Sequence, residues 1–175
     1  MSSNAVSSDS PVGLPANPIV VIPARLASTR LPGKPLAEIA GEPMIVHVWR
    51  RALEADVGPA IVACADIEII DAIKKAGGDA VYTNPAHMSG SDRVFECVHT
   101  VDPQRRHDCI INLQGDLPTI KPESVRAVLE PLSKPEVDIA TLVAEITDEA
   151  ERDDSNVVKT VLAMPRGKKC GRALY

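Results

Sequence analysis

Residues 19–23, with the sequence IVVIP, decide the fold that we expect for this chain. Four β-branched residues stand in a row between Pro18 and Pro23. Such a short, uninterrupted apolar run is typical of a strand that is buried on both faces, as the strands of a parallel sheet are. We therefore take it as the first, central strand of the protein and read the rest of the chain from there.

Beyond this run, apolar segments of helical and of strand type alternate along the chain. We expect helices over residues 44–53, 66–77, 91–101 and about 122–132, with Asp66 and Ser91 as N-caps and Pro122 in the first turn. We expect further strands over residues 60–64, 79–83, 109–113, 138–146 and 156–162, and one that begins at Ala173. Strands that alternate with helices imply an α/β fold, here a doubly wound, mostly parallel sheet.

Composition sets the class of protein. With 175 residues, 45% of them hydrophobic, one domain over residues 19–175 is expected, preceded by a disordered tail over 1–18 that is rich in Ser and Pro. A net charge of -5 and only 2% aromatic residues argue against nucleic acid as a partner. No apolar run approaches the length of a membrane span, so we expect no membrane insertion and a cytoplasmic location. The four cysteines have no C-x-x-C spacing and are expected to be free thiols.

The segment after the first strand, residues 24–36, is called the basic loop below. In open α/β sheets ligands bind beyond the carboxyl ends of the strands, so this segment is the first candidate for a site. It carries Arg25, Arg30 and Lys34, and no acidic residue occurs between Asp9 and Glu38. Forked guanidinium donors and a lysine charge suit phosphate groups, and the Ser28 hydroxyl adds a further donor. The pattern is not a Walker A motif, and a solvated basic loop remains the alternative interpretation.

Five motifs in order resemble one enzyme family. Residues 22–36, IPARLASTRLPGKPL, are similar to the signature of the CMP-3-deoxy-manno-octulosonate cytidylyltransferases. Further similar motifs are GEPMIVHV at 41–48, HMSGSDR at 87–93, NLQGDLP at 112–118 and VVKTV at 157–161. The resemblance extends from Pro18 to Tyr175 and implies a fold of the nucleotide-diphospho-sugar transferase type.

The resemblance also implies an activity. Enzymes of this family transfer CMP from CTP to 3-deoxy-manno-octulosonate for lipopolysaccharide synthesis and release pyrophosphate. By their positions in the motifs, the residues expected to bind CTP are Ala24, Arg25, Ser28, Arg30, Lys34, Ser91, Arg93 and Gln114. Arg25, Lys34 and Asp116 are expected to serve catalysis, with Asp116 as the Mg²⁺ ligand; the alternative for Asp116 is a cap of the turn before Pro118.

Two departures from the family pattern bear on activity. Leu117 stands where the family has a glutamate, and family members continue beyond Tyr175. We expect the segment with most sugar contacts, a second metal-binding aspartate and the dimer contacts to be missing, which would weaken a homodimer. The alternatives are therefore a non-catalytic CTP-binding remnant, or a cytidylyltransferase for another sugar acid.

Two further groups of residues receive structural interpretations. His87 has no partner carboxylate that the sequence fixes, so a structural or substrate-adjacent role is expected. The acidic residues of segment 148–154 are expected to form a solvated loop.

Overall fold

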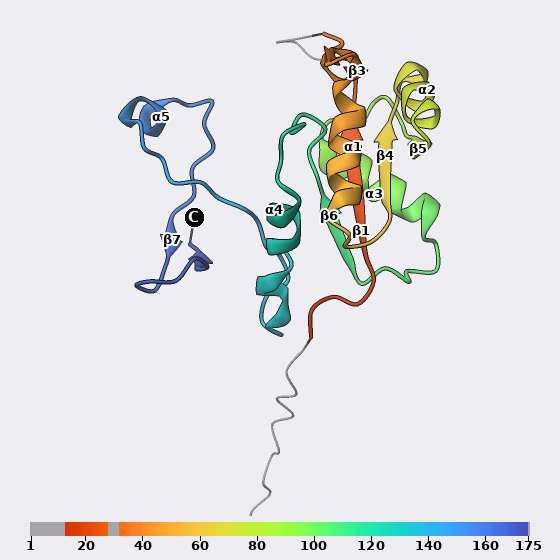
Figure 1. The fold of residues 1–175 in the computed structure, drawn as a ribbon. Helices are drawn as coiled ribbons and strands as arrows, with labels where there is room; N and C mark the ends of the chain where they lie inside the picture. The colour runs from red at the N-terminus through yellow and green to blue at the C-terminus, as the bar shows by residue number, and fades with distance from the viewer. Residues whose placement is uncertain (1–12, 28–31, 175) are drawn as a thin grey trace, which may run out of the picture.

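A parallel four-stranded sheet forms the centre of the protein (Figure 1). The structure is a computed structural model that describes residues 13–27 and 32–174, so most of the predicted N-terminal tail lies outside the described residues. The strand order is β5-β4-β1-β6. Its strands are β1 (Pro18–Ala24), β4 (Ala60–Cys64), β5 (Asp79–Tyr82) and β6 (Cys109–Asn112).

Strand β1 lies inside the sheet and is buried along its whole length. It pairs in parallel with β4 on one side, where Val20 lies opposite Ala60, and with β6 on the other, where Val20 lies opposite Ile111. Its side chains alternate between two cores: Val20 and Ile22 enter one, whereas Ile19 and Val21 enter the other. This two-sided burial is why the run contains apolar residues only.

Helices cover both faces of the sheet, which confirms the doubly wound α/β prediction. Three helices pack on the larger core, and they are α1 (Met44–Glu54), α2 (Ile67–Lys75) and α4 (Pro122–Ala127). The fourth, α3 (Gly90–Val101), packs through Val94 and Cys97 on the opposite face, so Figure 1 shows α1 and α3 on either side of β1. A small hairpin of β2 (Glu38–Ile39) and β3 (Glu42–Pro43) follows the 3-10 turn η1 (Lys34–Leu36) and precedes α1.

Helix α4 is held against the end of α1 by one arginine. Arg126 donates hydrogen bonds to the carbonyl oxygens of Glu54 and Ala55, at 3.2 and 2.9 Å. The last carbonyls of a helix have no hydrogen-bond donor inside it, so Arg126 supplies hydrogen bonds that water would otherwise make. Helix α4 is shorter than predicted, because Pro131 lacks the N–H that a continuing α-helix requires, and a 3-10 turn, η2 (Glu130–Ser133), takes its place.

The last part of the chain differs most from the sequence prediction. Residues 138–146 and 156–161 contain no strand; only β7 (Leu162–Ala163) forms, and it pairs with β8 (Arg172–Ala173) in a two-residue antiparallel ladder. A strand requires a ladder of backbone hydrogen bonds to a neighbouring strand, and among the described residues neither segment forms such a ladder. The acidic segment is also not a loop, because its centre forms the short helix α5 (Glu149–Asp153), capped by the Asp148 carboxylate at the Ala150 N–H, 2.9 Å away.

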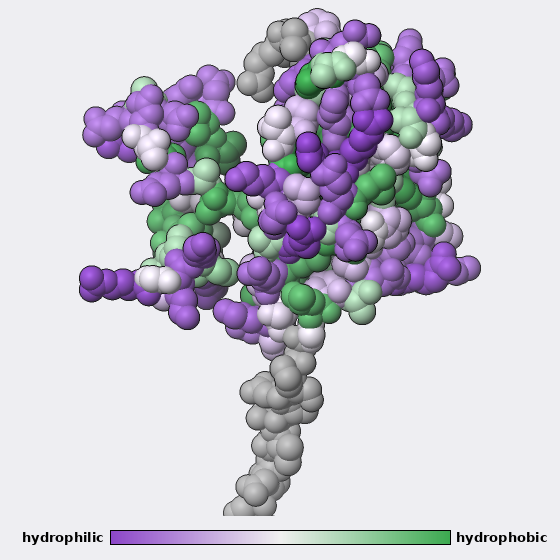
Figure 2. Space-filling view, in the orientation of Figure 1, coloured by the Kyte–Doolittle hydropathy of each residue, from purple (hydrophilic) through white to green (hydrophobic). Residues whose placement is uncertain are grey.

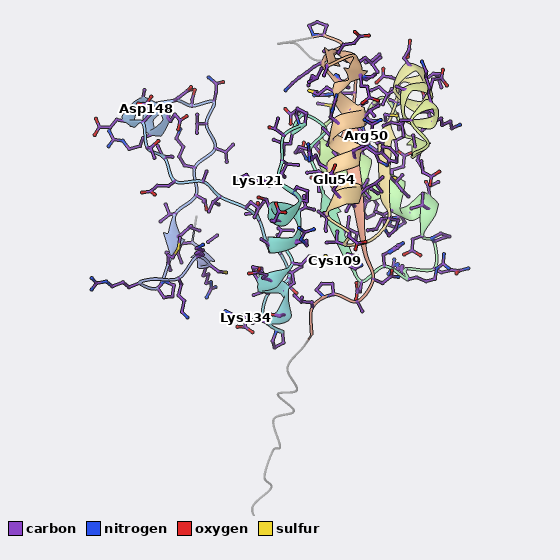
Figure 3. All side chains as sticks on the ribbon, in the orientation of Figure 1. Arg50, Glu54, Cys109, Lys121, Lys134 and Asp148 are labelled. Atoms are coloured by element: carbon purple, nitrogen blue, oxygen red, sulfur yellow. The ribbon has the colours of Figure 1, made fainter. Side chains whose placement is uncertain are left out.

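Residues 138–174 form what we call the C-terminal lobe. No described residue after Leu129 is buried, and the lobe lies to one side of the sheet in Figure 1. Asp148, labelled in Figure 3, is far from the helices that cover the sheet. An apolar groove of about 1110 Å³ runs between β6, α4 and the first residues of the lobe, and apolar side chains of the lobe are turned toward this side in Figure 2. Among the described residues, no helix has the length and apolar character needed to cross a membrane.

The connection from α1 to β4 should depend on Gly58. Its φ is +151°, and a Cβ there would lie 2.1 Å from the Pro18 carbonyl oxygen at the start of β1. Since a backbone carbonyl in a buried strand cannot move aside, we expect Gly58→Ala to lower the free energy of unfolding by about 2–4 kcal/mol in a urea titration. Gly13→Ala is the matched control, because nothing lies within 4 Å of a Cβ at that position. Equal stability of the two variants would contradict this account of the close approach.

Candidate functional site

A pocket opens beyond the carboxyl ends of β1 and β6, where ligands bind in open α/β sheets. It has a volume of about 230 Å³. The elements around it are the end of β1, η1, the start of α1, the start of α3 and the turn after β6. Its lining residues are Pro23, Ala24, Arg25, Lys34, Pro35, Met44, His87, Ser89, Gly90, Arg93, Gln114, Gly115 and Asp116.

The basic loop contributes two cations to this pocket. Arg25 follows β1 directly, and Lys34 opens η1 after Gly33, whose φ of +73° turns the chain back. The Gly33 N–H donates to the Leu26 carbonyl at 3.0 Å, so the two ends of the loop lie together. Ser28 and Arg30, both predicted to bind CTP, lie outside the described residues.

The turn after β6 contributes the acid. Asp116 and Lys34 form an ion pair with 2.9 Å between Oδ2 and Nζ, and their side chains are 53% and 37% exposed. The carboxylate and the ammonium group therefore both stay open to an incoming ligand. Gly115 precedes Asp116. Any other residue at this position would force the backbone to shift, because its Cβ would lie 2.8 Å from the Pro23 carbonyl oxygen. This close approach sets Asp116 against the end of β1.

The start of α3 forms another wall. Ser89 caps the helix: its hydroxyl accepts from the Asp92 N–H at 3.1 Å, and the Asp92 carboxylate accepts from the Ser89 N–H. The Ser89 hydroxyl also donates to the Asp92 carboxylate at 2.7 Å, and this hydrogen bond, followed by that from the Ser89 N–H, lowers the pKa of Asp92 below its ordinary value. The prediction that Ser91 caps α3 is wrong, and Ser91 is exposed and absent from the pocket lining.

The sequence contained a signal that separates the two serines. Ser89 is followed three residues later by an acid, Asp92, which is the pattern of a capping box, whereas Ser91 is followed by Val94. With Ser89 as the cap, Gly90 is the first helical residue and lines the pocket. A Cβ at Gly90 would lie 3.3 Å from the Pro23 ring, so α3 begins close to the end of β1.

Two further predicted nucleotide ligands, one buried and one exposed, line the pocket. Arg93 is only 3% exposed, and its guanidinium donates to the Thr83 hydroxyl. The Gln114 amide donates to the Asn112 side-chain oxygen at 2.7 Å. Both side chains are thus held in place before any ligand arrives, by Thr83 just after β5 and by Asn112 in β6.

His87 has a partner that the sequence did not reveal. Its Nε2 pairs with the Glu96 carboxylate on α3, and the same carboxylate accepts from the Asn84 N–H at 2.8 Å. The Asn84 and His87 hydrogen bonds, in that order, lower the pKa of Glu96. Glu96 lies nine residues after His87, a separation at which no local pattern predicts contact. His87 is therefore a fixed wall residue of the pocket.

Leu117, the departure from the family motif, points elsewhere. It is 42% exposed and lines the apolar groove beside β6, not the pocket that contains Asp116.

The cysteines do not line the pocket either. Burial raises the pKa of Cys64 to about 11 and of Cys97 to about 12, so both remain neutral thiols at physiological pH.

This arrangement favours a polyphosphate accompanied by a metal ion. Two open cations, the start of a helix and one carboxylate surround a small cavity, which is the chemistry that binds phosphate groups and Mg²⁺. In the part of the chain that the structure describes, no three acidic, histidine or cysteine side chains form a metal cluster. A metal held here would take most of its ligands from phosphates and water.

Comparison with known proteins agrees with this chemistry. The chain is 59% identical over 158 residues to a 3-deoxy-manno-octulosonate cytidylyltransferase of Paramagnetospirillum magneticum, covering 90% of this chain and 64% of the relative. It is 62% identical over 161 residues to the protein of that name from Rhodospirillum centenum, covering 92% and 63%. The chain thus spans a little under two thirds of the length of these relatives.

A solved structure of a CMP:2-keto-3-deoxy-manno-octonic acid synthetase, in complex with CTP, has a similar fold. The superposition has a TM-score of 0.62 at 45% sequence identity and covers 67% of this chain and 47% of the other. A family model described as cytidylyltransferase matches residues 19–173. On this evidence the chain belongs to the cytidylyltransferase family.

Proposed function

We propose that this chain binds CTP in the pocket beyond β1 and β6 and transfers CMP to 3-deoxy-manno-octulosonate with release of pyrophosphate. The observation that carries the proposal is the meeting of Arg25, Lys34 and Asp116 in one pocket, from loops that lie about 80 residues apart in the sequence. The high identity to enzymes named for this reaction supports the choice of nucleotide and sugar acid. The product would serve lipopolysaccharide synthesis.

The reaction assigns different tasks to the two sides of the pocket. The sugar hydroxyl attacks the α-phosphate of CTP, and pyrophosphate leaves, so negative charge grows on the phosphates. Arg25 and Lys34 lie where they can neutralise that charge, and the start of α3 adds its N–H groups. Ala24, Arg93 and Gln114 would hold the nucleoside end. Ser28, Arg30 and Ser91 stay predictions as CTP ligands.

The Lys34–Asp116 pair supports the assignment of Asp116 to a metal. The ammonium group of Lys34 already lies 2.9 Å from Oδ2, so this oxygen faces a place that a cation can occupy. Asp116 would hold Mg²⁺, which when bound would supply positive charge against the charge that develops on the leaving pyrophosphate. As the nucleotide enters, Lys34 would leave the carboxylate for a phosphate, because both groups are partly exposed and free to turn. Asp116 would then be free to accept the metal.

The direct test is pyrophosphate release by this 175-residue chain with CTP, Mg²⁺ and the sugar acid. We expect turnover that Asp116→Ala lowers by about 100-fold or more, because the metal and the phosphates lose their fixed position. Asp148→Ala is the control, since it removes an acid from the C-terminal lobe and should leave the rate unchanged. Equal rates for the chain and its Asp116→Ala variant would contradict the proposed role of Asp116.

A non-catalytic CTP-binding protein is the second candidate, because the geometry that carries the proposal concerns nucleotide binding. The pocket itself is formed by residues between Pro23 and Asp116. A calorimetric titration with CTP on the same samples separates the candidates. Binding together with turnover supports the enzyme, and binding without turnover by a folded chain supports the second candidate. Substitution of other sugar acids in the turnover assay tests the choice of acceptor.

If Lys34 moves from Asp116 to a phosphate when CTP binds, then removal of its ammonium group should change metal affinity and CTP affinity in opposite directions. In Lys34→Met the Asp116 carboxylate loses its ammonium partner, so Mn²⁺ should bind the nucleotide-free chain more tightly, by about threefold. The same variant should bind CTP about tenfold more weakly, because a phosphate contact is lost. Mn²⁺ binding is measured by water-proton relaxation and CTP binding by calorimetry.

Lys121→Met is the matched control for this experiment. Lys121 is an exposed lysine just before α4, labelled in Figure 3, and it does not line the pocket. Its loss should change neither affinity. A Lys34→Met variant with weaker Mn²⁺ binding than the unmodified chain would rule out competition between Lys34 and the metal for Asp116.

A further inference from the structure

Asp66 makes a contact that its place in the sequence does not explain. It occupies the N-cap position of α2, yet its side chain accepts no hydrogen bond from that helix. Instead its Oδ2 accepts from the backbone N–H of Leu26, 2.9 Å away and 40 residues earlier. An N-cap aspartate normally satisfies the free N–H groups of its own helix, so here the carboxylate serves the basic loop in place of the cap.

The sheet brings these two residues together. Ala24, the last residue of β1, lies opposite Cys64, the last residue of β4. Leu26 and Asp66 each lie two residues beyond those ends. Past the end of the parallel ladder, the Asp66 side chain supplies the acceptor that the next backbone carbonyl would have supplied within a strand. The first residues of the basic loop therefore leave β1 in a direction set by β4.

Leu26 is held on both sides. Its N–H is bound by Asp66, and its carbonyl accepts from the Gly33 N–H at 3.0 Å. The residues next to this clamp are the two cations of the pocket: Arg25 precedes Leu26, and Lys34 follows Gly33. One residue, Leu26, thus links the positions of both cations through its N–H and its carbonyl.

Asp66 is itself well fixed. Its carbonyl accepts from the N–H groups of Ile69 and Ile70, in the first turn of α2, and from the Cys64 thiol at 3.7 Å. Ile69 and Cys64 are fully buried. The carboxylate does not line the pocket, so it orients the loop without touching the ligand.

We propose that Asp66 is a positioning residue for nucleotide binding: its carboxylate holds the Leu26 backbone so that Arg25 and Lys34 meet the phosphates together. The proposal rests on the proposed function of the pocket. The acceptor oxygen is what matters, and the negative charge is not required, because a full charge near bound phosphates opposes their binding.

The test compares Asp66→Ala, which removes the acceptor, with Asp66→Asn, which removes the charge but keeps an oxygen at the same place. We expect Asp66→Ala to weaken CTP binding about tenfold in calorimetry, and Asp66→Asn to stay within about threefold of the unmodified chain. The loss should be smaller for CMP than for CTP, because the cations that Asp66 places act on the phosphates that CMP lacks. A general loosening of the fold would weaken both nucleotides alike.

Glu68→Ala is the matched control, since it removes an exposed acid from the first turn of the same helix without a contact to the loop. Thermal unfolding is recorded for every variant. Hydrogen exchange at the Leu26 amide adds a readout that needs no ligand: protection should persist in Asp66→Asn and fall in Asp66→Ala. If Asp66→Ala does not fold, Asp66→Glu replaces it, because the longer side chain displaces the acceptor and should also weaken CTP binding.

The outcomes separate this proposal from the proposed function. CTP affinity that is unchanged in Asp66→Ala, or in Asp66→Glu where that variant replaces it, would overturn the positioning role. Equal losses in Asp66→Asn and Asp66→Ala would also overturn it, because the charge would then be the active feature. An unmodified chain that fails to bind CTP, with the Leu26 amide still protected, would instead overturn the proposed function and with it the purpose assigned to Asp66.

Discussion

The pairing of β1 with a parallel neighbour on each side determines the positions of the other parts of the site. Parallel strands end at the same edge of a sheet, so the segments that leave β1 and β6 emerge side by side. That is why Arg25 and Asp116 line one pocket, although β4, β5 and three helices lie between them in the sequence. The burial of β1 on both faces fixes this edge, since a one-residue slip of the strand would exchange the side chains of the two cores.

The charges of Lys34 and Asp116 balance each other within the pocket. The chain as a whole carries a charge of -5, which opposes the approach of a nucleotide triphosphate. Inside the pocket, Lys34 neutralises Asp116 until a ligand arrives, so neither charge is left alone. A nucleotide with its metal would bring opposite charges for both partners at once. Under the proposed function, this exposed ion pair would keep the two side chains ready for a metal and a phosphate without a large energetic cost.

The part of the fold that sequence reasoning predicted correctly is the part with strong local signals. Three such signals are the apolar run of β1, the helical spacing of apolar residues in α1 and the glycines after α2. Each reflects burial or backbone conformation within a few residues. The family motifs likewise led to Ala24, Lys34 and Gln114, which the pocket contains. One error and one open question concern contacts between elements. Among the described residues the predicted strand over 138–146 forms no pairing, and the Glu96 partner of His87, which the sequence left open, comes from α3.

The pocket and the C-terminal lobe depend on different forces. The pocket is built by residues between Pro23 and Asp116, and its walls rest on buried strands and on close approaches such as that of Gly115 to Pro23. The lobe has no buried residue, and Ile139 and Leu142 face a groove beside the open edge of β6. Its geometry can therefore change without moving Arg25, Lys34 or Asp116. Nucleotide binding, which rests on the buried strands, should accordingly be insensitive to changes in the conformation of the lobe.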